Sequence, residues 1–137
     1  MSTIIFSKIN LDQEIDPNTA SPKLEIYDRK VKLFFPLRSE KLGCIEFINC
    51  RGLRSGSPND EGYYKYNDGF WNINDYPEIE WHSFYEIKNA PLEYLNQFYI
   101  QGEKTELSNP SLKHYAFFMK EGTFECLAED YREEVVD

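Results

Sequence analysis

Short runs of alternating apolar and polar residues, separated by turn-forming residues, are the feature that most constrains the fold of this chain. The runs at residues 3–9, 23–36 and 42–50 are rich in β-branched and aromatic side chains, and Val31 and Leu33 alternate with lysines. A period of two is typical of strands, because successive side chains point to opposite faces of a sheet. The sequence therefore predicts a mainly antiparallel β structure.

Turn residues between these runs predict two hairpins. Asp28-Arg29 divides the run at residues 23–36, and Glu121-Gly122 separates apolar runs at residues 113–120 and 123–130. Glycine supplies the positive φ that a tight turn requires. We therefore expect the two arms of each run to pair as antiparallel strands.

Helical signals are weaker and are limited to two places. Residues 89–100 predict one short helix, because Asn89 can cap its start, Pro91 falls in its first turn, and Leu92, Leu95 and Phe98 have helical spacing. The acidic end, residues 129–137, predicts only a frayed turn.

The whole chain, residues 1–137, is expected to form a single domain, because no repeat or linker interrupts it and 41% of its residues are hydrophobic. The fold class predicted is mainly β, or α+β if the short helices are counted. The architecture expected is an antiparallel sandwich or a rolled partial barrel of about six to eight strands, with at most one or two short helices.

The charge of the chain is uneven. The formal net charge is −9, but residues 1–58 carry nine basic and seven acidic side chains, whereas residues 59–137 carry six basic and seventeen acidic ones. An acidic surface repels phosphate backbones and anionic lipids. We therefore expect neither a nucleic acid nor a membrane as partner, and favour a protein partner that is basic.

Features that would indicate secretion or a cofactor are missing from the sequence. There is no apolar run of about 18 residues and no signal-peptide pattern. The three cysteines, Cys44, Cys50 and Cys126, are an odd number without CxxC spacing, and are expected to be buried thiols. The expectation is a cytoplasmic protein without a cofactor.

The segment at residues 79–87 carries the candidate acid/base residues. If it is a strand, its odd-numbered side chains face the core, and the even-numbered ones share the polar face, namely Glu80, His82, Phe84 and Glu86. A solvated charged face is the simpler interpretation, and an acid/base site is the alternative. A metal site would require His82 and His114 to converge, and their separation of 32 residues gives no local ligand signature.

A long aromatic, glycine-rich stretch spans residues 51–77, and it is predicted to be a loop or a projecting hairpin around the turn sequence at residues 67–69. Tyrosine and tryptophan provide large contact areas at low entropic cost. Its aromatic side chains therefore form either a binding surface or a cap on the core. The candidate binding residues are Tyr63, Tyr64, Tyr66, Phe70 and Trp71.

The leading functional hypothesis is a small binding or inhibitory module that recognises a basic protein through its acidic and aromatic surface. The alternative is a small-molecule-binding β-barrel or an acid/base enzyme that uses His82 with Glu80 or Glu86. A homodimer built through the aromatic stretch is a third interpretation.

Overall fold

The structure, a computed structural model, describes residues 4–16, 23–27, 29–55, 79–80, 82–90, 95, 98–100, 111–118 and 123–136. These residues contain ten strands. They are β1 (Ile5–Ile9), β2 (Lys23–Tyr27), β3 (Lys30–Pro36), β4 (Leu42–Ile48), β5 (Gly52–Ser55), β6 (Ser83–Lys88), β7 (Tyr99–Ile100), β8 (Lys113–Phe118), β9 (Thr123–Ala128) and β10 (Asp130–Val136).

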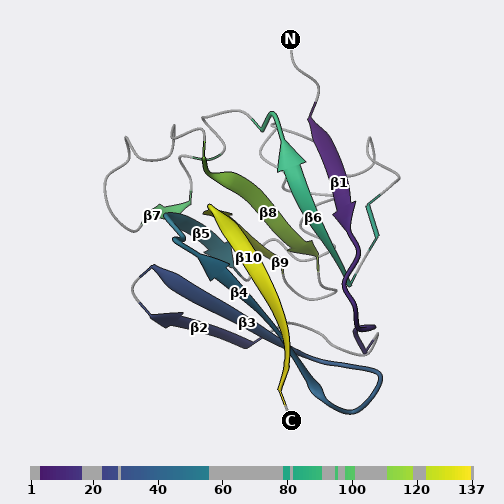
Figure 1. The fold of residues 1–137 in the computed structure, drawn as a ribbon. Coiled ribbons are helices and arrows are strands. Elements are labelled where there is room, and N and C mark those ends of the chain that lie inside the picture. The colour runs from purple at the N-terminus through teal and green to yellow at the C-terminus, as the bar shows by residue number, and fades with distance from the viewer. Residues whose placement is uncertain are drawn as a thin grey trace.

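The strands form two antiparallel sheets that lie one over the other (Figure 1). The six-stranded sheet has the order β1-β6-β8-β9-β5-β7, and the four-stranded sheet has the order β10-β4-β3-β2. The predicted mainly β fold is confirmed, and the two open sheets correspond to a sandwich. The strand count exceeds the expected six to eight because β5, β7 and β10 were not predicted as strands.

The two predicted hairpins are both present. Strands β2 and β3 pair from Tyr27 opposite Lys30 to Lys23 opposite Phe34. Strands β8 and β9 also pair, but in a different register from the predicted one: Phe118 lies opposite Thr123, whereas a two-residue turn at Glu121-Gly122 would have placed residue 120 there.

Two predictions near the ends of elements were wrong. The helix expected over residues 89–100 does not reach its predicted end, because Tyr99–Ile100 form strand β7 and pair with β5. Within residues 91–97 the structure describes only Leu95, whose backbone is helical. The acidic segment expected to be a frayed turn is strand β10, which pairs with β4 from Asp130 opposite Ile48 onward.

The two sheets are joined at a corner where a pair of strands passes from one sheet to the other. On one side of the corner β4 pairs with β10, and on the other side β5 pairs with β9. Strand β5 follows β4 in the chain and β10 follows β9, and the second pairing begins with Gly52 opposite Leu127. Three residues, 49–51, oppose two residues, 128–129, so the corner contains a β-bulge. Asn49 adopts a φ of 54°, which asparagine tolerates, and its Nδ2 donates a hydrogen bond to Glu129 over 2.7 Å.

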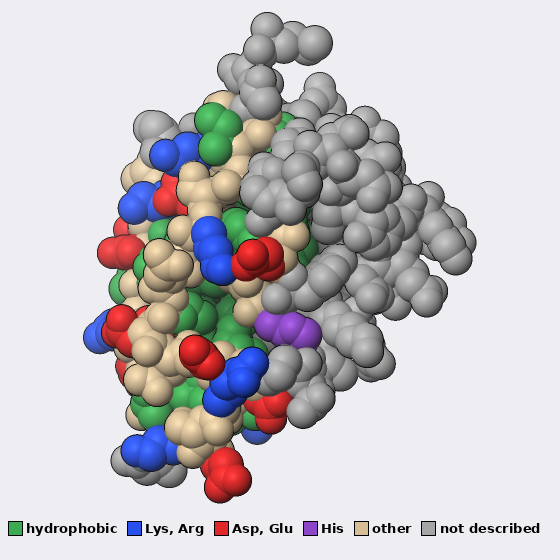
Figure 2. Space-filling view, turned by 90° about the vertical axis from the view of Figure 1, so that its right-hand side faces the viewer, with side chains coloured by type: hydrophobic (Ala, Val, Ile, Leu, Met, Phe, Trp, Pro, Cys, Tyr) green, Lys and Arg blue, Asp and Glu red, His purple; other side chains and the backbone are tan. Residues whose placement is uncertain are grey.

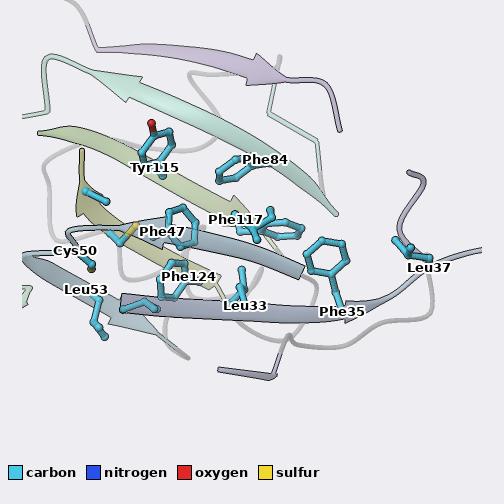
Figure 3. Close-up of a cluster of buried hydrophobic side chains, with 14 residues drawn as sticks. Leu33, Phe35, Leu37, Phe47, Cys50, Leu53, Phe84, Tyr115, Phe117 and Phe124 are labelled. Carbon is cyan, nitrogen blue, oxygen red and sulfur yellow. The ribbon is translucent and has the colours of Figure 1, made fainter. Parts of the chain in front are cut away.

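The space between the sheets is filled by aromatic side chains (Figure 3). The Phe47 ring lies 5.3 to 5.9 Å from the rings of Phe84, Tyr115 and Phe124, which come from β6, β8 and β9. All four side chains are almost completely buried. Aromatic side chains of this size each bury about 150–250 Å² of surface, so this inter-sheet core supplies much of the driving force for folding.

A second apolar cluster covers the other face of the six-stranded sheet. It contains Phe6, Tyr85, Phe98, Phe118 and other buried residues, with partly buried side chains such as Leu95 packed against them. The six-stranded sheet is therefore buried on both faces. This explains why β8 and β9 read as nearly continuous apolar runs rather than as alternating ones.

Gly43 of β4 occupies a position where the inter-sheet core leaves no room for a methyl group. A Cβ built there would lie 2.5 Å from Phe35 Cε2 and 2.9 Å from Leu37 Cδ2, and both neighbours are buried. We expect Gly43→Ala to lower the free energy of unfolding by about 1–3 kcal/mol, as overpacked cores do. Urea denaturation would measure the change, and the added substitution Phe35→Leu should recover part of it. Equal stability of Gly43→Ala and the wild type would contradict this packing.

Candidate functional site

His82 lies immediately before β6, and not inside a strand as residues 79–87 were predicted to be. Its φ is 63°, and its backbone N–H donates a hydrogen bond to the Phe118 carbonyl oxygen over 2.6 Å. A left-handed conformation interrupts the alternation of a strand, so β6 begins only at Ser83. The side chain is partly buried.

The predicted arrangement of faces along this segment was therefore only half right. Tyr85 and Ile87 are buried, as expected of the odd-numbered side chains. Phe84, however, was assigned to the polar face and is instead 1% exposed in the inter-sheet core. The reason is that β6 belongs to a sheet that is covered on both sides.

Glu80 and Glu86 are separated from each other by the fold. The Glu80 carboxylate accepts a hydrogen bond from Lys8 Nζ over 2.6 Å, and both side chains are largely exposed. This hydrogen bond raises the pKa of Lys8. Glu86 lies on the face of β6 that carries Phe84, opposite Tyr115 in the ladder, and its charge helps to raise the pKa of that tyrosine, which burial raises most. The two carboxylates and His82 thus do not form one cluster among the described residues.

His114 is far from His82. Ile87 is the ladder partner of His114, whereas His82 lies just before Ser83, the partner of Phe118, so the two histidines are at opposite ends of the β6–β8 ladder. Among the residues that the structure describes, no group of three or more His, Cys, Asp or Glu side chains could hold a metal ion.

His114 instead forms a buried pair with Glu125, a residue that the sequence reasoning did not single out. His114 Nε2 lies 2.9 Å from Glu125 Oε1, and the exposed fractions of the two side chains are 6% and 0%. The Phe98 ring meets the imidazole edge to face at 5.5 Å. A polar pair in such surroundings is costly to bury unless its members are hydrogen-bonded to each other.

The three cysteines are buried free thiols in the described core. Burial raises the pKa of Cys44 to about 11. Cys50 and Cys126 are hydrogen-bonded to each other in the inter-sheet core; this bond lowers the pKa of Cys50, while burial raises the pKa of Cys126. Without access for a reagent, all three thiols act as small packing groups.

A groove of about 470 Å³ lies beside His82, where the end of β1 and the start of β6 face the connection between β3 and β4. Its charged side chains come from distant parts of the chain, namely Lys8, Glu14 and Arg38. Figure 2 shows this side of the molecule, with hydrophobic side chains exposed between basic and acidic ones and a histidine beside them. No sequence motif could have grouped these residues, because the sheets bring them together.

The edge of the four-stranded sheet is a second candidate surface. Strand β10 is the terminal strand of that sheet as far as the chain is described, and residues 129–136 carry four acidic side chains and one basic side chain. We call this surface the acidic edge. It comprises the carboxylates of Glu129, Asp130, Glu133 and Glu134 and the exposed side chains of Val135 and Val136.

The aromatic stretch predicted as a binding surface can be placed only at its beginning. Gly52–Ser55 form β5, between β9 and β7, so the loop does not begin at residue 51 as predicted. The candidate binding residues lie outside the described residues. They are Tyr63, Tyr64, Tyr66, Phe70 and Trp71.

Comparisons with known proteins identify no relative of this chain: no family model, no curated protein and no solved structure matches it. Within the described ranges, no helix has the length and apolar character needed to cross a membrane.

Proposed function

We propose that the protein is a binding or inhibitory module that recognises a basic protein, and that the acidic edge is part of the recognition surface. The observation that carries the proposal is the character of β10. Residues 129–136 contain four carboxylates and a single basic side chain, Arg132, on a strand at the margin of a sheet. A strand at the edge of a sheet offers a partner both its charged side chains and its backbone N–H and C=O groups.

Apolar contact area accompanies the acidic edge. Six of the seven exposed large hydrophobic side chains in the described part of the chain belong to the four-stranded sheet. Two of them, Val135 and Val136, are on β10, and Leu42 and Ile48 lie at the two ends of its neighbour β4. Apolar side chains surrounded by charges are the usual composition of a protein interface.

Charge complementarity specifies the chemistry of the partner. The one basic side chain of the segment, Arg132, lies 3.9 Å from the buried carboxylate of Glu46, which also pairs with Lys30. Asp130 and Glu134 present exposed carboxylates on the same face of β10 as Arg132. Acidic rims of this kind accelerate encounter with a basic protein, and desolvated aromatic side chains supply affinity. We assign the latter role to the aromatic residues between 63 and 71.

The acidic edge can be tested by removing charge without disturbing the fold. The variant is Asp130→Asn/Glu134→Gln. Glu133 is not substituted, because its carboxylate accepts hydrogen bonds from the Asp12 N–H and fixes the segment after β1. Proteins retained from source-cell lysate by the immobilised wild type would be identified, purified and titrated by calorimetry. We expect a partner with a basic isoelectric point whose Kd rises about fivefold to tenfold in the variant and also rises with salt.

A matched control separates local charge from net charge. Glu14→Gln/Glu40→Gln removes two exposed carboxylates elsewhere on the molecule and should leave the Kd within about twofold. If every retained protein binds the acidic-edge variant as tightly as the wild type, the acidic edge is not the recognition surface. Loss of binding in Tyr64→Ala/Trp71→Ala would independently support the aromatic part of the proposal.

A further inference from the structure

The groove beside His82 is a site separate from the exposed carboxylates of Asp130 and Glu134, although Glu133 of the acidic edge supports one of its walls. Ile9, Leu11 and Ile15, which are partly buried against the inter-sheet core, contribute apolar surface to the floor of the groove. Polar atoms make up the larger part of the lining, and Phe84 lies almost completely buried beneath it. A volume of about 470 Å³ lies in the range of pockets that bind small ligands.

The walls of the groove are fixed by hydrogen bonds. The segment after β1 is tied to the β3–β4 connection by a bridge between Ile15 and Leu37 and by the Arg38 N–H, which donates to the Glu14 carbonyl over 3.0 Å. The Asp12 N–H is bound by the Glu133 carboxylate, at 2.8 and 3.2 Å from its two oxygens. The groove is therefore formed before any ligand arrives, which lowers the entropic cost of binding.

His82 lines the groove with its backbone in a left-handed conformation, at a φ of 63°. The hydrogen bond from the His82 N–H to Phe118 holds this conformation.

The charges that line the groove favour an anion. Lys8 and Arg38 are lining residues, and Glu14 is the one acidic lining residue among those described, although the chain as a whole has a net charge of −9. Both cations have carboxylate partners, Lys8 with Glu80 at 2.6 Å and Arg38 with Glu14 at 3.1 Å. These ion pairs are exposed and weak, so a ligand carboxylate can replace either partner at low cost.

We propose that this groove binds a small amphipathic organic anion, with its apolar body on the floor between β1 and β6 and its carboxylate at the Arg38 and Lys8 side chains. His82 contributes a ring nitrogen as a further hydrogen-bond donor to the carboxylate. The proposal does not depend on protein recognition by the acidic edge.

The test uses three probes of similar shape and different charge. Sodium hexanoate, hexanamide and hexylammonium chloride would be titrated separately into ¹⁵N-labelled protein, with the amide signals followed by NMR. We expect hexanoate to shift the signals of Lys8, Leu11, Arg38 and His82 with a millimolar Kd. Hexanamide should bind at least about tenfold more weakly, and the cation should bind least.

Two arginine variants provide the control. The Arg38 and Arg132 side chains are each 60% exposed and each is paired with a glutamate, but only Arg38 lines the groove. Arg38→Gln should raise the Kd of hexanoate about tenfold, whereas Arg132→Gln should leave it unchanged. Equal binding of hexanoate and hexanamide by the wild type, equally strong shifts with inorganic phosphate, or shifts confined to residues outside the groove would each overturn the proposal.

Discussion

Phe47→Ala is expected to lower the free energy of unfolding by about 3–5 kcal/mol, the range for large-to-small substitutions of buried phenylalanine. Phe47 has no solvent exposure, and rings from three strands of the opposite sheet surround it (Figure 3). The substitution removes both the buried surface and these ring contacts, and the sheets cannot close over the cavity without moving β4. Equilibrium unfolding in guanidinium chloride would measure the loss.

The companion variant Phe47→Leu keeps most of the volume and should lose no more than about half as much. Because small domains are stable by only about 5–15 kcal/mol, the alanine variant should be partly unfolded at moderate temperature. A loss of less than about 1 kcal/mol would mean that Phe47 is not at the centre of the core.

His114→Leu should be the second most damaging single change, with a loss of about 3 kcal/mol. It takes a hydrogen-bond partner from Glu125, whose side chain has no access to water. A buried carboxyl group that loses its partner is destabilising by several kcal/mol, whereas replacing both members of a buried pair by apolar residues is often close to neutral. The double variant His114→Leu/Glu125→Leu should therefore be more stable than His114→Leu alone, by about 2 kcal/mol.

Denaturation midpoints of the three proteins would measure this coupling. The exposed pair between Lys8 and Glu80 is the matched control, because its distance of 2.6 Å is short but both side chains contact water. Glu80→Gln should change the stability by less than about 0.5 kcal/mol. Equal losses in the single and double variants at positions 114 and 125 would show that the two residues are not coupled.

The β class of the fold could be predicted from the sequence because it rests on local alternation. Val31 and Leu33 are buried on β3, as their alternation with lysines predicts, and this strand pairs with β2 through the expected hairpin. The turn residues predicted which neighbouring strands pair. Strand β10 was not predicted, because Glu133 occupies an inward position and interrupts the alternation of apolar side chains. Residues 130–136 are recognised as a strand by their pairing with β4.

The candidate sites depend on long-range contacts, and for that reason sequence reasoning missed most of them. The predicted two-residue turn would have placed His114 opposite residue 129, whereas the observed ladder places it opposite Leu127, diagonally beside Glu125. A lone glutamate within the apolar run at residues 123–128 was the one available signal. His82 lines a groove with Arg38 because the segment after β1 crosses to the other sheet, which no local pattern indicates.

The bulged corner between the sheets has a consequence for how the protein unfolds. Residues 42–55 and 123–136 form one paired ribbon whose two halves belong to different sheets, and backbone hydrogen bonds from Glu129 to Ile48 and from Arg51 to Leu127 continue the pairing through the corner. Separating β10 from β4 exposes the inter-sheet core and also pulls on β9, the strand between β8 and β5. The two sheets should therefore unfold as one cooperative unit, with amide protons of both becoming exchangeable in the same opening event.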